Sequence, residues 1–139
     1  MNPQKILILL EKDNNDLLLN LALSIIKNNN AKAYFLFVIE IPHKYPIEFE
    51  IGDQISIGEN TLKYAHDYLN MNKLNYDINS SNFILLQSRN TAVALIRESE
   101  RIKVDLIAYL KDKKSDDYKY EFIKSNSKSN IIELLEIEK

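Results

Sequence analysis

Short, continuous apolar runs alternate in this chain with longer segments whose apolar residues recur at helical spacing. Two of the runs, residues 6–10 and 33–41, are rich in Ile, Leu, Val and aromatic residues, which is typical of strands buried on both faces of a parallel sheet. Between them we predict a helix that is capped by Asn15 or Asp16. Its apolar face would comprise Leu18, Leu21, Ala22, Ile25 and Ile26. Strand, helix and strand within about 35 residues make a βαβ unit with a right-handed crossover.

The pattern repeats after an irregular connection. Pro42 and Pro46 end the second run, and we expect the connection to continue through Gly58. Residues 59–72 then form a second helix, which places Leu62, Ala65 and Leu69 on one face.

Two further strands and a third helix follow. We predict a strand over residues 83–86, a helix capped by Asn90 or Thr91, and a fourth strand over residues 102–110. Because strands and helices alternate, the predicted class is α/β. The expected architecture is an open, mainly parallel sheet of four to five strands with helices on both faces, of the Rossmann-like type.

The last part of the chain is more polar. Residues 111–128 contain six lysines, three aspartates and one glutamate, a composition that favours a flexible polar loop. In residues 129–139, the apolar residues fit a helix better than strict alternation, but a final strand of six or seven residues stays open as an alternative.

Length and composition predict a single domain over residues 1–139. The chain has 45% hydrophobic and 27% charged residues and a net charge of −2, which gives no reason to expect nucleic acid as a partner. It has no cysteine, which excludes disulfides and thiolate chemistry. Its apolar runs are too short for a signal peptide or for the ~20 residues of a membrane span. We therefore expect a cytoplasmic protein without direct membrane insertion.

Neither a catalytic nor a metal site is predicted from the residue pattern. His43 and His66 have no second ligand at metal-binding spacing. Residues 13–16 start like a calcium loop but lack its glycine and distal glutamate, so we interpret them as a capping turn. Arg89 lies before the third helix, where it is either an anion ligand or a solvated turn residue. We predict that the protein is not an enzyme.

The order of elements and several local strings resemble the universal stress protein family. The string KILILLEKDNNDLLLNLA resembles that family's first strand, acidic turn and first helix, and AYFLFVIEIP resembles its second strand. The string LLQSRNTAVALIRESERIKVDLIAYL resembles its third strand, third helix and fourth strand, so that the resemblance covers residues 5–110. The connection VIEIPHKYP looks most like divergent members that form cytosolic tails of membrane transporters.

The resemblance implies an ATP site that this chain has altered. Many family members bind ATP through an aspartate that ends the first strand and a loop with three glycines after the fourth. Here Glu11 stands at the acidic position, and Leu110 and Lys113 stand at the first two glycine positions. The third falls near residues 123–127, which also contain no glycine. A residue other than glycine disfavours positive φ by about 1–2 kcal/mol, so ATP is possible but disfavoured, and no cofactor is expected.

Two hypotheses for function follow. The first is a non-catalytic regulatory or interaction domain of the universal stress type that has lost ATP binding. It would act as a homodimer or as the cytosolic domain of a membrane transporter, although the family's C-terminal strand, often used in dimers, is shortened or absent here. The alternative is a small-molecule or nucleotide-binding stress-response module, whose nucleotide would contact Glu11, Val38, Leu110 and Lys113.

Overall fold

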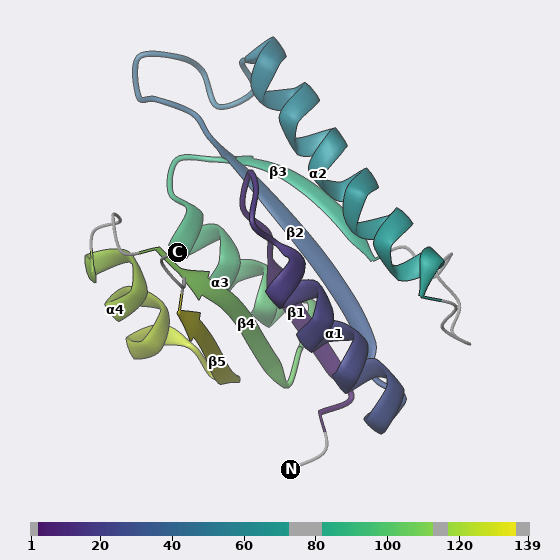
Figure 1. Ribbon diagram of the computed structural model, residues 1–139. Coiled ribbons are helices and arrows are strands. Elements are labelled where there is room, and N and C mark those ends of the chain that lie inside the picture. Colours follow the sequence, from purple (N-terminus) through teal and green to yellow (C-terminus); the bar gives the residue numbers. More distant parts are fainter. Residues whose placement is uncertain (1–2, 73–81, 113–116, 136–139) are drawn as a thin grey trace.

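A computed structural model describes residues 3–72, 82–112 and 117–135. Strands and helices alternate along this part of the chain (Figure 1). In chain order they are β1 (Lys5–Leu9), α1 (Asp16–Asn29), β2 (Lys32–Glu40), α2 (Gly52–Met71), β3 (Phe83–Ser88), α3 (Thr91–Ile102), β4 (Leu106–Lys111), α4 (Asp117–Asn126) and β5 (Asn130–Leu135).

The strands form one sheet in the order β3-β2-β1-β4-β5, and each neighbouring pair is parallel. Connections move from β1 outward through β2 to β3, then cross to β4 and β5. Right-handed crossovers therefore place α1 and α2 on one face and α3 and α4 on the other (Figure 1). The predicted α/β class is confirmed. Between β1 and β4 the order reverses, and open α/β sheets bind ligands beyond the carboxyl ends of such strands.

The sheet separates two apolar clusters. The cluster under α1 and α2 includes Ile6, Ile8 and Phe35, and the cluster under α3 and α4 includes Leu7 and Leu9. All four apolar residues of β1 are at most 1% exposed, because alternate side chains of a central strand enter opposite clusters. This is why the first apolar run is continuous.

Gly58 lies inside α2, which starts at Gly52. The expectation that the irregular connection continues through Gly58 was therefore wrong. A Cβ atom at residue 58 would lie 2.6 Å from Leu85 Cδ1 and 3.0 Å from Phe37 Cδ1. Glycine at this position lets the helix approach the sheet closely, which is a packing role and not a turn.

The third helix and fourth strand also differ from the expected bounds. α3 continues to Ile102, and Lys103 ends it in the left-handed conformation with φ 62°. β4 accordingly starts at Leu106 and not at residue 102. Of the two predicted caps, Asn90 and Thr91, the structure has Asn90, whose side chain accepts a 3.1 Å hydrogen bond from the Val93 N–H.

The polar segment at residues 111–128 is not a loop throughout, because α4 occupies Asp117–Asn126. Two of its residues, Tyr120 and Ile123, are at most 2% exposed. They anchor a helix whose other residues are mostly polar, which is why the composition resembled a loop. The final segment forms β5, the strand alternative, so the C-terminal strand expected to be shortened or absent is present with six residues. Pairing with β4 outweighs the local helical spacing.

Among the described residues, no helix combines the length and hydropathy needed to span a membrane.

Candidate functional site

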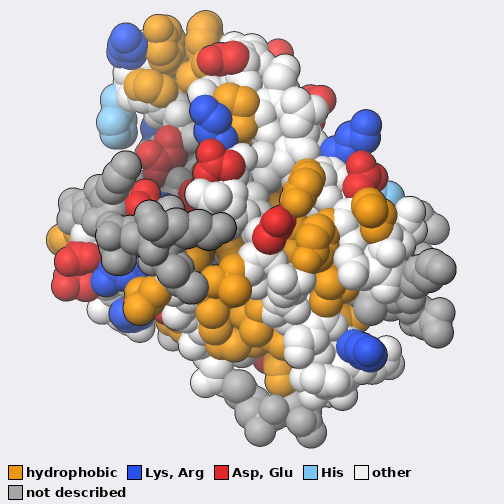
Figure 2. All heavy atoms as spheres, viewed as in Figure 1, with side chains coloured by type: hydrophobic (Ala, Val, Ile, Leu, Met, Phe, Trp, Pro, Cys, Tyr) orange, Lys and Arg blue, Asp and Glu red, His pale blue; other side chains and the backbone are white. Residues whose placement is uncertain are grey.

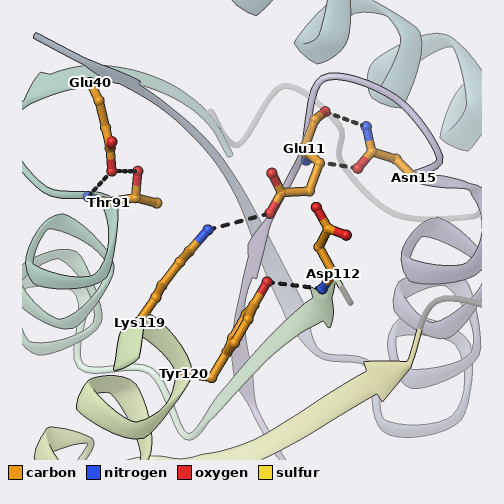
Figure 3. A network of polar contacts seen from close by, with 7 residues as sticks. All are labelled: Glu11, Asn15, Glu40, Thr91, Asp112, Lys119 and Tyr120. Carbon is orange, nitrogen blue, oxygen red and sulfur yellow. Dashed lines mark hydrogen bonds and ion pairs between the residues drawn. The ribbon is translucent and has the colours of Figure 1, made fainter. Parts of the chain in front are cut away.

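The candidate site lies at the carboxyl ends of β1, β2 and β4, where the topology predicts a ligand (Figure 3). Its side chains come from the turn after β1, the end of β2, the start of α3, the residue after β4 and the first turn of α4. They are Glu11, Asn15, Glu40, Thr91, Asp112, Lys119 and Tyr120.

The turn after β1 is closed by Asn15. The Glu11 N–H donates to Asn15 Oδ1 at 2.8 Å, and Asn15 Nδ2 donates to the Glu11 carbonyl at 2.7 Å. Asn15 occupies the N-cap position of α1 as predicted, but within the described chain its side chain makes no capping hydrogen bond to that helix. Its amide instead fixes the backbone that carries the Glu11 side chain.

Glu40 occupies the N-terminus of α3. Its Oε2 accepts hydrogen bonds from the Thr91 N–H at 2.9 Å and from Thr91 Oγ1 at 2.6 Å. A helix N-terminus attracts anions because its N–H groups and its dipole point toward the ligand. Here the anion is a carboxylate of the chain itself.

Tyr120 binds the backbone that follows β4. Its hydroxyl oxygen accepts a hydrogen bond from the Asp112 N–H at 2.9 Å, and its ring stacks on Tyr109 with a centroid separation of 5.4 Å. The ammonium groups of Lys111 and Lys119 lie 5.8 and 5.5 Å from the Tyr120 ring centroid. Both ammonium groups therefore lie within the range of a cation–π interaction with Tyr120.

Carboxylates dominate the charge at this edge. The Glu11 Oε1 lies 3.9 Å from Lys119 Nζ, and Figure 3 shows Lys119 reaching from α4 toward Glu11. Burial nevertheless raises the pKa of Glu11, and the nearby charges of Asp112, Asp13 and Glu40 raise it further against the effect of Lys119. Among the described residues, these carboxylates would also repel an added phosphate, against the attraction of Lys119.

We expect Glu11→Gln to raise the unfolding midpoint at pH 7. The pKa of Glu11 is higher in the folded state than in the unfolded chain. Ionised Glu11 therefore destabilises the fold at any pH above the pKa that it has in the unfolded chain. The gain should disappear as the pH falls below about 4.3, the ordinary glutamate value, where the wild-type side chain is also neutral. Thermal unfolding between about pH 3.5 and pH 7, a range that includes the ordinary glutamate pKa, measures the difference.

The control is Glu48→Gln, a neutralisation in the exposed connection between β2 and α2. This variant should follow the wild-type curve. A midpoint for Glu11→Gln that is equal to or below that of the wild type at pH 7 would contradict the prediction.

Of the predicted site residues that the structure describes, Glu11 alone lies in this group. Leu110 is 6% exposed and belongs to the core under α1 and α2, and Val38 packs on the opposite face of the sheet. Lys113 lies outside the described residues. Arg89 Nη1 donates to the carbonyls of Ile41 and Pro42 at 3.2 and 2.6 Å, so it holds the connection after β2.

Sequence reasoning missed Glu40, Asp112, Lys119 and Tyr120. Glu40 is the polar residue near the end of an apolar run, at the same relative place as Glu11, and this position could have identified it. Lys119 and Tyr120 lie in the segment that was expected to be a loop. In the described ranges, no three His, Asp or Glu side chains are grouped to hold a metal ion.

No family model matches this chain, and no curated protein matches it. Solved structures do resemble it. The universal stress protein from Archaeoglobus fulgidus superposes with a TM-score of 0.71 and 10% identity, over 94% of this chain and 92% of that chain. The complex of that organism's universal stress protein with dAMP superposes with a TM-score of 0.70 and 10% identity, over 96% of this chain and 98% of that chain. A universal stress protein family protein from Arabidopsis thaliana with AMP bound superposes with a TM-score of 0.63 and 10% identity, over 97% of this chain and 93% of that chain.

Proposed function

Because this chain has the fold of the universal stress proteins, as its order of elements predicted, we propose that it is a non-catalytic interaction domain that does not bind ATP. One observation carries the proposal: three backbone N–H groups at the carboxyl edge of the sheet already bind side chains of the chain itself. The N–H groups belong to Glu11, Thr91 and Asp112, and their acceptors are Asn15, Glu40 and Tyr120.

Phosphate sites in such folds depend on free backbone donors and helix N-termini. At the three described N–H groups of Glu11, Thr91 and Asp112, a phosphate would have to displace acceptors that are already in place. Each neutral hydrogen bond contributes about 0.5–1.5 kcal/mol net, and the bonds to the Glu40 carboxylate are about twice as strong. Repulsion from the Glu11 and Asp112 carboxylates adds to this cost.

The alternative function is a nucleotide-binding module. It is favoured by the adenine nucleotides in similar structures, namely dAMP in the Archaeoglobus fulgidus protein and AMP in the Arabidopsis thaliana protein. Among the described residues, Lys119 is the cation beside Glu11, so a nucleotide bound there would have to tolerate that carboxylate.

Titration calorimetry with ATP and magnesium, and separately with AMP, tests the proposal. We expect no binding heat and no change in the unfolding midpoint. The second readout is sensitive, because a ligand at 100 times its Kd stabilises a folded protein by about 2.7 kcal/mol. Saturable binding at micromolar concentration would reject the proposal and support the nucleotide-binding module.

A matched variant tests the reason for the absence of binding. Glu40→Gln removes the carboxylate charge at the N-terminus of α3 while keeping the shape of the side chain. If internal acceptors exclude phosphate, any affinity for AMP should be higher in this variant than in the wild type. Action through a homodimer or a membrane transporter, and a cytoplasmic location, stay predictions.

A further inference from the structure

We propose that α4 is an autoinhibitory lid on the carboxyl edge of the sheet, which must open before an outside anion can bind the Asp112 N–H. Two consecutive residues of the helix carry the inference. Lys119 Nζ lies 3.9 Å from Glu11 Oε1, and the Tyr120 hydroxyl oxygen accepts the hydrogen bond of the Asp112 N–H at 2.9 Å. The lid would regulate the site to which the proposed function refers, so the inference rests on that function.

These two contacts lie on both sides of the point at which the strand order reverses. Glu11 lies in the turn after β1, and Asp112 comes directly after β4. In an open parallel sheet, this is the place where a ligand binds. Figure 3 shows Lys119 and Tyr120 reaching from α4 into this region. The first half of α4 therefore occupies, with its own side chains, the place that the topology assigns to a ligand.

Tyr120 is the residue that holds α4 closed. It is 2% exposed, and its ring stacks on the buried ring of Tyr109 with an interplanar angle of 18°. The Tyr109 hydroxyl in turn donates to Glu133 Oε2 at 2.6 Å, and Lys124 Nζ of α4 lies 3.1 Å from the same oxygen. α4 is thus attached to β4 through Tyr120 and to β5 through Lys124.

The rest of α4 contributes little to the core. Tyr120 and Ile123 are its buried residues, and Figure 2 shows charged side chains of both signs on the left of the molecule, where Figure 1 places α4. The ion pair between Lys111 Nζ and Asp117 Oδ1, at 3.4 Å, joins side chains that are 30% and 73% exposed. Exposed ion pairs contribute little to stability. Because segments with few buried contacts open at lower free energy than the whole fold, α4 can open while the central strands stay folded.

Opening changes what the carboxyl edge offers to a ligand. With α4 closed, the Asp112 N–H donates to Tyr120, and Lys119 lies beside Glu11. With α4 open, the Asp112 N–H loses the Tyr120 acceptor and can donate to a phosphate oxygen, as backbone N–H groups do in anion sites. Repulsion from the Glu11 and Asp112 carboxylates keeps this binding weak.

Tyr120→Phe tests the lid, because it keeps the stacked ring and removes the hydroxyl acceptor. The matched control is Tyr118→Phe on the same helix, where the side chain is 73% exposed. Amide hydrogen exchange at Asp112, followed by NMR, should be about tenfold faster or more in Tyr120→Phe, as a loss of 1.4 kcal/mol would give. Titration with inorganic phosphate should shift the Asp112 amide resonance in this variant, but in neither the wild type nor the control.

Lys124→Gln tests whether α4 opens as a unit. Lys124 lies in the last turn of the helix and contacts β5, so it acts on Asp112 only through the helix. Loss of its ion pair should raise the exchange rate at Asp112 by about two- to fivefold, the effect of an ion pair at a partly exposed position. Thermal unfolding establishes that each variant is folded. An unchanged rate in Lys124→Gln would reject opening as a unit, and the lid with it.

The remaining outcomes separate the lid from the proposed function. A folded Tyr120→Phe variant with unchanged exchange at Asp112, or without a response to phosphate, would overturn the lid and leave the proposed function in place. Binding of AMP to the wild type would reject the proposed function. In that case the lid stands if AMP makes amide exchange at Ile123 faster, because the ligand then selects the open helix, and it falls if Ile123 stays protected.

Discussion

Leu110→Gly should destabilise the protein severely and should not create an ATP site. The substitution restores glycine at the first loop position that the universal stress resemblance implies. Leu110 is 6% exposed and packs in the core under α1 and α2. Removing a buried leucine side chain to alanine costs about 2–5 kcal/mol, and glycine in a strand costs about 0.5–1 kcal/mol more. This is a large part of the 5–15 kcal/mol that is typical for total stability.

Denaturant unfolding measures the loss, and Leu135→Gly is the matched control. Leu135 ends β5 with 62% of its surface exposed, so the same change there should cost much less. Calorimetry on Leu110→Gly with ATP and magnesium should again give no binding heat. A stability within about 1 kcal/mol of the wild type, well below the range for buried leucines, would show that Leu110 does not support the core.

Gly58→Val should destabilise the protein by about 1–3 kcal/mol, the usual cost of overpacking. The new Cβ would lie 2.6 Å from Leu85 Cδ1 and 3.0 Å from Phe37 Cδ1. The end of the Leu85 side chain can move, but Phe37 is 7% exposed and is confined by the core. The two Cγ methyl groups of valine need further space, so α2 must shift away from the sheet.

Gly52→Ala provides the comparison for Gly58→Val in the same helix. A Cβ at residue 52 would meet no atom within 4 Å, so this variant should be as stable as the wild type or slightly more stable. Both free energies come from denaturant midpoints. Equal stabilities for the two variants would mean that the contact between α2 and β3 tolerates a side chain at residue 58.

The fold could be predicted wherever the burial of an element is evident from neighbouring residues in the sequence. The continuous apolar run of β1 indicated a central strand, and Asn90 indicated the start of α3, because both signals lie within a few neighbouring residues. The helix α4 could not be recognised from the sequence, because its only buried residues are Tyr120 and Ile123 in an otherwise polar segment. Gly58 was misread because a glycine required for helix packing is indistinguishable in sequence from a glycine in a turn.

The candidate site was predictable only in part. The place of Glu11 after the first strand identified it, because parallel strands end at a common edge. Neither of the other two pairs follows from local spacing: Glu40 and Thr91 are 51 residues apart, and Asp112 bonds to Tyr120 of α4, a helix that was expected to be a loop. The spacing of residues in the sequence carries no information about such contacts. Only the structure therefore showed that side chains of the chain itself accept hydrogen bonds from these backbone N–H groups.

The central position of β1 determines the order in which this chain can fold during its synthesis. Ile6 pairs with Ala33 on one side and with Leu106 on the other. At translation rates of about 5–20 residues per second, β2 emerges within seconds of β1, whereas β4 follows only after nearly the whole sheet of β1, β2 and β3 has been made. Until then one edge of the most apolar strand has no neighbour. The nascent chain therefore has an unpaired edge of β1, an aggregation hazard, until β4 has left the ribosome.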